Sequence, residues 1–91
     1  MMEQLSFFGL GKLGLPLAAL FARSGLVTIG IDIDSALVAR LQAGETPYVE
    51  PGLAELLEEA APAITYTTDA HSAAATHASI ILVPTPSDAG A

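Results

Sequence analysis

Short apolar runs alternate with longer amphipathic stretches along the whole chain. The short runs are rich in β-branched or aromatic residues and have the length of buried strands; they cover residues 5–8, 27–33, 64–67 and 79–83. The longer stretches repeat apolar residues at helical spacing; they cover residues 12–24, 35–43, 53–60 and 69–75. This alternation predicts an α/β fold, in which a parallel sheet of four strands has helices on both faces.

Several helix boundaries carry start and stop signals. In the first helix, Pro16 lies in the first turn, where a missing N–H costs least, and Gly25 follows the end. Asp34 or Ser35 is expected to cap the second helix, a role that we prefer to ligand binding for Asp34. Asp69 is expected to cap the alanine-rich helix. The apolar residues at helical spacing in the first helix are Leu13, Leu17, Leu20 and Phe21.

A glycine-rich segment joins the first strand to the first helix. Gly9, Gly11 and Gly14 follow the pattern G-x-G-x-x-G, which by itself is common, so its position between a strand and a helix gives it weight. There Gly9 allows a tight turn, Gly11 lets a diphosphate approach the backbone, and Gly14 lets the helix pack close to the strand. The helix N-terminus would attract the diphosphate with its N–H groups and its partial positive charge.

An acidic residue meets a second requirement of dinucleotide binding. Asp32 stands near the end of the next strand, about 20 residues after the glycines, where a carboxylate accepts hydrogen bonds from the adenosine ribose. A 2′-phosphate would meet like charge there, and Ile33 offers no arginine to receive it, so we predict NAD rather than NADP. The alternative is a tight strand–helix turn in a domain that binds nothing.

Lys12 is a candidate contact of the diphosphate, because it stands beside the proposed anion site. The alternative is a lysine at the helix start that points into water. His71 and His77 have no carboxylate or nucleophile at a suggestive spacing, so we interpret both as structural or solvated. We predict no catalytic residue and no metal site in this chain.

Composition narrows the classes of function. The 91 residues suit one modest domain, and ten acidic against three basic residues give a net charge of −7, which disfavours nucleic acid and anionic lipid as partners. No cysteine is present, which excludes a disulfide or a thiolate nucleophile within the chain and fits the cytoplasm. There is no secretory signal pattern and no apolar run of the roughly 20 residues that would cross a bilayer.

Five segments together resemble the N-terminal NAD-binding domain of the UDP-glucose/GDP-mannose dehydrogenases. These segments are FGLGKLGLPLA at 8–18, GIDID at 30–34, AGETPYVEPGLAELL at 43–57, TTD at 67–69 and ILVPTP at 81–86. The resemblance covers almost the whole chain. It implies a Rossmann-like fold, with residues 1–91 forming about the first half of a doubly wound NAD-binding domain.

The resemblance also implies which residues bind the cofactor. The expected set is Gly9, Leu10, Gly11, Lys12, Leu13, Gly14, Asp32, Val83, Pro84 and Thr85. Ligands of open parallel sheets lie at the carboxyl ends of strands where the strand order reverses, here between the first and fourth strands, which suits Thr85. The family usually has Tyr-Val where this chain has Lys12 and Leu13, and often a lysine near the ribose where this chain has Leu37.

The family oxidises the C6 hydroxyl of a nucleotide sugar to a carboxylate, for polysaccharide biosynthesis. Its catalytic cysteine and its sugar pocket lie beyond the position where this chain stops, so we expect a fragment that binds NAD without catalysis, from an NAD-dependent oxidoreductase. One alternative is a non-catalytic nucleotide-binding or self-associating module, in which the fourth strand pairs with that of another copy to form a homo-oligomer. Another is the NAD domain of a hydroxyacyl or hydroxyacid dehydrogenase, against which the segments EPGL and VPTP weigh.

Overall fold

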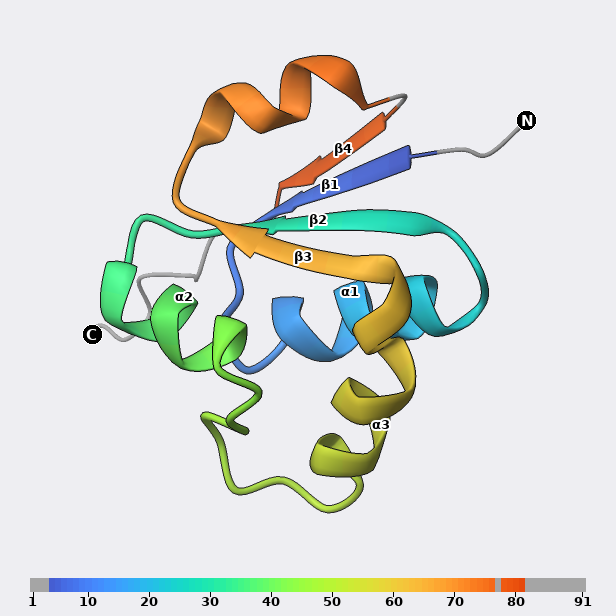
Figure 1. Cartoon of the computed structure of the whole chain (residues 1–91), viewed down its shortest axis with the longest axis vertical. Coiled ribbons are helices and arrows are strands. Elements are labelled where there is room, and N and C mark those ends of the chain that lie inside the picture. Colours follow the sequence, from blue (N-terminus) through green and yellow to red (C-terminus); the bar gives the residue numbers. More distant parts are fainter. Residues whose placement is uncertain (1–3, 77, 82–91) are drawn as a thin grey trace, which may run out of the picture.

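One parallel sheet organises the molecule. The computed structural model describes residues 4–76 and 78–81. Within them, the strands pair in the order β3-β2-β1-β4 (Figure 1); they are β1 (Gln4–Phe8), β2 (Val27–Ile31), β3 (Ile64–Thr67) and β4 (Ala78–Ile81). The order reverses between β1 and β4, the place where open parallel sheets bind ligands at the carboxyl ends of their strands.

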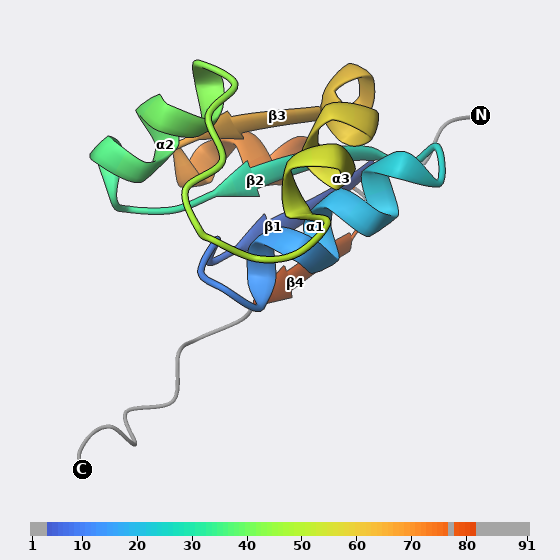
Figure 2. The ribbon, with the colours of Figure 1, turned by 90° about the horizontal axis from the view of Figure 1, so that it is seen from below.

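Helices cover both faces of the sheet, as the alternation predicts (Figures 1 and 2). One face carries three α-helices and a short 3₁₀ helix; these are α1 (Gly14–Arg23), α2 (Ser35–Gln42), α3 (Leu53–Ala60) and η1 (Ala61–Ala63). The opposite face carries the 3₁₀ helix η2 (Ala70–Ala75). The predicted α/β architecture of three layers is therefore confirmed.

Two boundaries of the described elements differ from the predicted ones by two residues. The second strand ends at Ile31 instead of residue 33, because the Asp32 carboxylate accepts the N–H of Asp34 at 2.9 Å and turns the chain away from the sheet. The first helix begins at Gly14, so residues 11–13 belong to the loop that precedes it. The predicted caps are present: the carboxylate of Asp34 accepts the N–H of Leu37, and that of Asp69 accepts the N–H of His71.

Helix α1 is buried through its small residues. Ala18, Ala19 and Ala22 are almost completely buried, together with Leu15, whereas Leu20 and Phe21 of the apolar stripe are partly exposed. Alanines on the buried face leave room for neighbouring elements to come close to the helix axis, and the larger Leu17 packs at the edge of the core. Size as well as polarity therefore selects the face of α1 that is buried.

Strand β4 is held against β1 by hydroxyl groups as well as by the ladder. Ser6 in β1 is fully buried, and its hydroxyl lies 2.7 Å from that of Ser79 and 3.1 Å from that of Thr76. Pairing in register sets Ile81 beside Phe8, immediately before the glycine segment. The end of the described part of β4 thus lies next to the loop between β1 and α1.

None of the described helices is long and apolar enough to span a membrane.

Candidate functional site

The loop between β1 and α1 begins with a tight turn at Gly9. Gly9 has a φ of 106°, a left-handed conformation that side chains disfavour, and its N–H donates to the carbonyl of Ile31 at 2.8 Å. The turn leaves β1 at its carboxyl end and stays attached to the neighbouring strand β2. This geometry suits the role that the sequence predicts for the first glycine of the loop.

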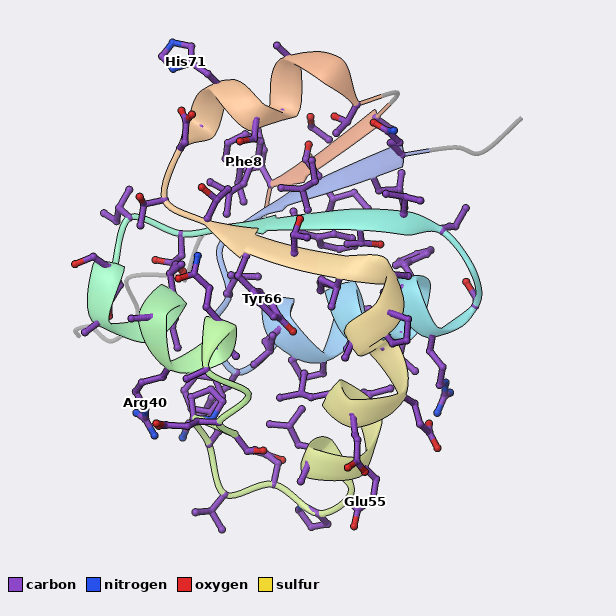
Figure 3. The ribbon with its side chains drawn as sticks, in the orientation of Figure 1. Phe8, Arg40, Glu55, Tyr66 and His71 are labelled. Atoms are coloured by element: carbon purple, nitrogen blue, oxygen red, sulfur yellow. The ribbon has the colours of Figure 1, made fainter. Side chains whose placement is uncertain are left out.

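Leu10 fixes the loop to the core instead of facing solvent. Its side chain is fully buried and lies over Gly30 in β2: a Cβ built on Gly30 would stand 3.0 Å from Leu10 Cδ2 and 3.2 Å from Cδ1 of Tyr66. Gly30 therefore leaves the space that Leu10 fills. Tyr66 pairs with Gly30 and projects from β3 toward the helices (Figure 3). The side chain of Leu10 is therefore not available to line a diphosphate.

Asp32 joins the end of β2 to this loop. One carboxylate oxygen, Oδ2, accepts the N–H of Leu10 at 2.8 Å, and the other, Oδ1, accepts the N–H of Asp34 at 2.9 Å. The carboxylate is half-buried, and each of its oxygens has a further lone pair available. The structure thus brings together the two features that the sequence places far apart, the glycine segment and the acid.

The next three residues of the loop form its open side. Gly11, Lys12 and Leu13 are exposed, and a Cβ built on Gly11 would meet no described atom within 4 Å. Leu13 provides no side-chain cap for α1. Gly14, by contrast, is buried at the start of the helix, where a residue without a side chain can pack closely. A ligand can therefore approach the backbone at Gly11 without displacing a side chain.

For the other predicted residues, the structure does not distinguish between the possible roles or does not describe the residue. Lys12 is exposed and forms no ion pair with the described residues, which suits either interpretation of its role. Val83, Pro84 and Thr85, like His77, lie outside the described residues. His71 does have a carboxylate partner, contrary to the sequence interpretation: its Nδ1 lies 3.2 Å from Oδ1 of Asp69. Because this histidine projects away from the fold into solvent (Figure 3), the interpretation of a solvated side chain still suits it.

Tyr48 is a contact that sequence reasoning missed. It lies in the loop between α2 and α3, is half-buried, and donates its hydroxyl to the carbonyl of Leu10 at 3.0 Å. Burial raises the pKa of its phenol, and the nearby carboxylates of Asp32 and Asp34 raise that pKa further, against a smaller opposing effect of Arg40. One signal in the sequence could have pointed to Tyr48. It lies in the segment AGETPYVEPGLAELL, which resembles the family although no predicted turn or cap requires these residues.

Comparison with known proteins adds independent evidence. Residues 3–91 match the model of the "UDP-glucose/GDP-mannose dehydrogenase family, NAD binding domain". The UDP-glucose 6-dehydrogenase of Haloferax volcanii is 42% identical over 85 residues, and the GDP-mannose 6-dehydrogenase of Pseudomonas syringae pv. tomato is 40% identical over 87 residues. Each alignment covers 92% of this chain and 20% of the relative.

A solved structure supports the same relationship. The UDP-glucose dehydrogenase from Pyrobaculum islandicum superposes with a TM-score of 0.84 at 38% sequence identity, covering 91% of this chain and 20% of that one. This chain thus spans about a fifth of the length of the relatives it matches. The matched domain, the superposition and the glycine loop joined to Asp32 agree, and the chain belongs to the UDP-glucose/GDP-mannose dehydrogenase family through its NAD-binding domain.

Proposed function

We propose that this chain binds NAD along the loop of residues 9–14, with Asp32 as the acceptor for the adenosine ribose. The hydrogen bond between Asp32 and the Leu10 N–H carries the proposal, because it places the acid of β2 directly beside the glycine loop. Val83, Pro84 and Thr85 are proposed to complete the site from the segment that follows β4. Lys12 and Leu13 are proposed to line the diphosphate from the exposed part of the loop.

The described residues fit the chemistry of a dinucleotide. The open space at Gly11 leaves room for a diphosphate at the start of α1, where the partial positive charge of the helix favours an anion. The remaining lone pairs of the Asp32 carboxylate suit the two hydroxyls of a ribose. NAD, when bound, supplies the acceptor for a hydride.

Selectivity for NAD over NADP is proposed to come from Asp32 and its neighbour. A 2′-phosphate placed at the ribose would meet the Asp32 carboxylate, and Ile33 is 95% exposed with no charge to offer. Arg40 already pairs with Glu45 at 3.1 Å. The NADP complex would therefore be weakened by like charge.

We further propose that the chain serves as the NAD-binding portion of a nucleotide-sugar 6-dehydrogenase. This proposal rests on family membership and on relatives named for UDP-glucose and GDP-mannose oxidation. Since the chain contains no cysteine, any step that uses the family's catalytic cysteine would depend on residues outside these 91. A cytoplasmic location and a role in polysaccharide biosynthesis belong to the same proposal.

Calorimetric titration with NAD, NADP and ADP-ribose tests the proposed binding. We expect the chain to bind NAD and ADP-ribose, and to bind NADP at least tenfold more weakly. Asp32→Asn should weaken NAD binding at least tenfold, because an amide loses charge and acceptor capacity toward the ribose. Glu55→Gln removes the same charge from the exposed face of α3, and it should leave NAD affinity within about twofold of the unmodified chain.

Circular dichroism of each variant separates lost binding from lost folding. Folded, unmodified chain that shows no heat of binding at roughly millimolar NAD contradicts the proposal. Equal affinities for NAD and NADP contradict the proposed selectivity alone.

A further inference from the structure

The loop between α2 and α3, residues 43–52, has no role in the function proposed above. It holds the first ten residues of the segment AGETPYVEPGLAELL, and it passes along the side of the molecule where α1 begins (Figure 2). Gly52 ends this loop with a φ of 80°, and α3 follows directly. Only one side-chain hydrogen bond described for this loop reaches the glycine loop, and it comes from Tyr48.

Leu10 is held through both of its backbone polar groups. Its N–H donates to Asp32 at 2.8 Å, and its carbonyl accepts the hydroxyl of Tyr48 at 3.0 Å. The two partners are side chains from different segments, 22 and 38 residues away in the sequence. A carbonyl can only accept, so Tyr48 must be the donor, which requires a protonated phenol.

The hydrogen bond from Tyr48 also constrains Gly11. The carbonyl of Leu10 and the N–H of Gly11 belong to one planar peptide unit, and no described peptide bond is cis. In a trans peptide these two groups point in opposite directions, so fixing the carbonyl fixes the N–H of Gly11. Glycine adopts many backbone conformations, and Gly11 is exposed. Its own carbonyl accepts the N–H of Leu15 at 3.0 Å, but that bond holds the next peptide unit, so the described bond that orients the Leu10–Gly11 peptide at its carbonyl is the one from Tyr48.

We propose that Tyr48 is a positioning residue of the cofactor loop, whose hydroxyl holds the Leu10–Gly11 peptide in the orientation that receives the diphosphate of a dinucleotide. The proposal rests on the NAD-binding function proposed above and assigns a role to a segment that this function leaves unexplained. Tyr48 acts through the backbone of Leu10 and does not itself touch the cofactor.

Tyr48→Phe tests this role, because it removes one oxygen atom and keeps the ring. We expect NAD affinity to fall about three- to tenfold, as for loss of one hydrogen bond that positions a binding group. In nuclear magnetic resonance spectra of the chain without NAD, the amide signal of Gly11 should shift and its hydrogen exchange should become faster. Tyr66→Phe is the matched control, since Tyr66 is also a partly buried tyrosine whose ring packs against the core.

The outcomes separate the positioning role from a purely structural one. A structural role would lower the thermal midpoint of Tyr48→Phe well below that of Tyr66→Phe, with the Gly11 amide unchanged, and this result overturns the proposal. Equal NAD affinities of Tyr48→Phe and Tyr66→Phe also overturn the proposal. When the unmodified chain binds no NAD, the proposed function fails, and the Gly11 amide then decides by itself whether Tyr48 orients the loop.

Discussion

Leu10 is attached to two separate segments through three chemical groups. Its side chain fills the space over Gly30, its N–H is bound by Asp32, and its carbonyl is bound by Tyr48. The following residue, Gly11, has open space on its outer side. A rigid residue followed by an accessible one suits a backbone that receives a diphosphate, because the donors are positioned before the ligand arrives.

Gly11→Ala separates binding from stability at this position. The new methyl group would meet no described atom and Gly11 has no positive φ, so we expect the free energy of unfolding to change by less than about 0.5 kcal/mol. The methyl would occupy the space proposed for the diphosphate, and NAD affinity should fall at least tenfold. Urea unfolding and calorimetric titration measure the two effects.

Gly44→Ala provides the opposite case. Gly44 follows α2 with a φ of 84° and has equally open space around its Cβ position, so alanine there strains the backbone by about 1–2 kcal/mol. The NAD affinity of the Gly44→Ala variant should stay unchanged.

If the Gly11→Ala variant has the same NAD affinity as the unmodified chain, the proposed position of the diphosphate is ruled out.

Strand β2 contributes more to the site than the acid at its end. It pairs with β1 on one side and β3 on the other, and Gly30, its fourth residue, pairs with Tyr66 in β3. Asp32 follows directly after the last residue of β2 and accepts the N–H of Leu10. Two positions of the chain that lie close together, Gly30 and Asp32, thus supply both the space for the Leu10 side chain and the acceptor for its N–H.

Gly30→Ala tests how tightly β2 seats the loop. The added Cβ would stand 3.0 Å from Leu10 Cδ2, and Leu10 is fully buried, so we expect a loss of about 1–3 kcal/mol in the free energy of unfolding. Leu10→Ala removes the crowded atoms, so the double variant should lose less than the sum of the single losses. Thermal and urea unfolding of the four chains measure this; a Gly30→Ala chain as stable as the unmodified one contradicts it.

The molecule as a whole is acidic, with a net charge of −7 and a sequence pI of about 4.3. The two tyrosines whose pKa is shifted are Tyr48 and Tyr66, and in both burial is the main cause that raises it. Both phenols therefore stay neutral in the folded state at a pH where the unfolded chain begins to ionise. Alkaline pH therefore changes the free energy of unfolding through these two tyrosines.

We expect stability to fall as the pH rises above about 10. Below that pH both states hold the phenolic protons and the full contribution of the two tyrosines is present. Above it the unfolded state binds fewer protons, so the free energy of unfolding decreases until the folded tyrosines also ionise. In the Tyr48→Phe variant, only the part of this decrease that is due to Tyr66 should remain. Urea unfolding at about pH 8 to 11 tests this, and an undiminished stability above about pH 10 contradicts it.

Much of the fold followed from local patterns. The alternation of apolar runs and amphipathic stretches was enough for the order of strands and helices, because length and spacing of the apolar residues differ between the two kinds of element. The capping roles of Asp34 and Asp69 were predictable, since capping depends on residues three positions or fewer away. Polarity alone did not predict which face of α1 is buried. Ala18, Ala19 and Ala22 are buried, whereas the larger Leu20 and Phe21 are partly exposed, because small side chains let neighbouring elements come closer to the helix.

The α/β class, the tight turn at Gly9, the family and the candidate acid Asp32 could all be inferred from the residues alone. That Leu10 faces the core, that Gly30 makes room for it, and that Tyr48 binds its carbonyl became evident only from the folded chain. Distance along the chain explains this difference. Turns and caps depend on neighbours in sequence, whereas the contacts of Leu10 join segments 20 to 38 residues apart that meet only when the sheet is assembled.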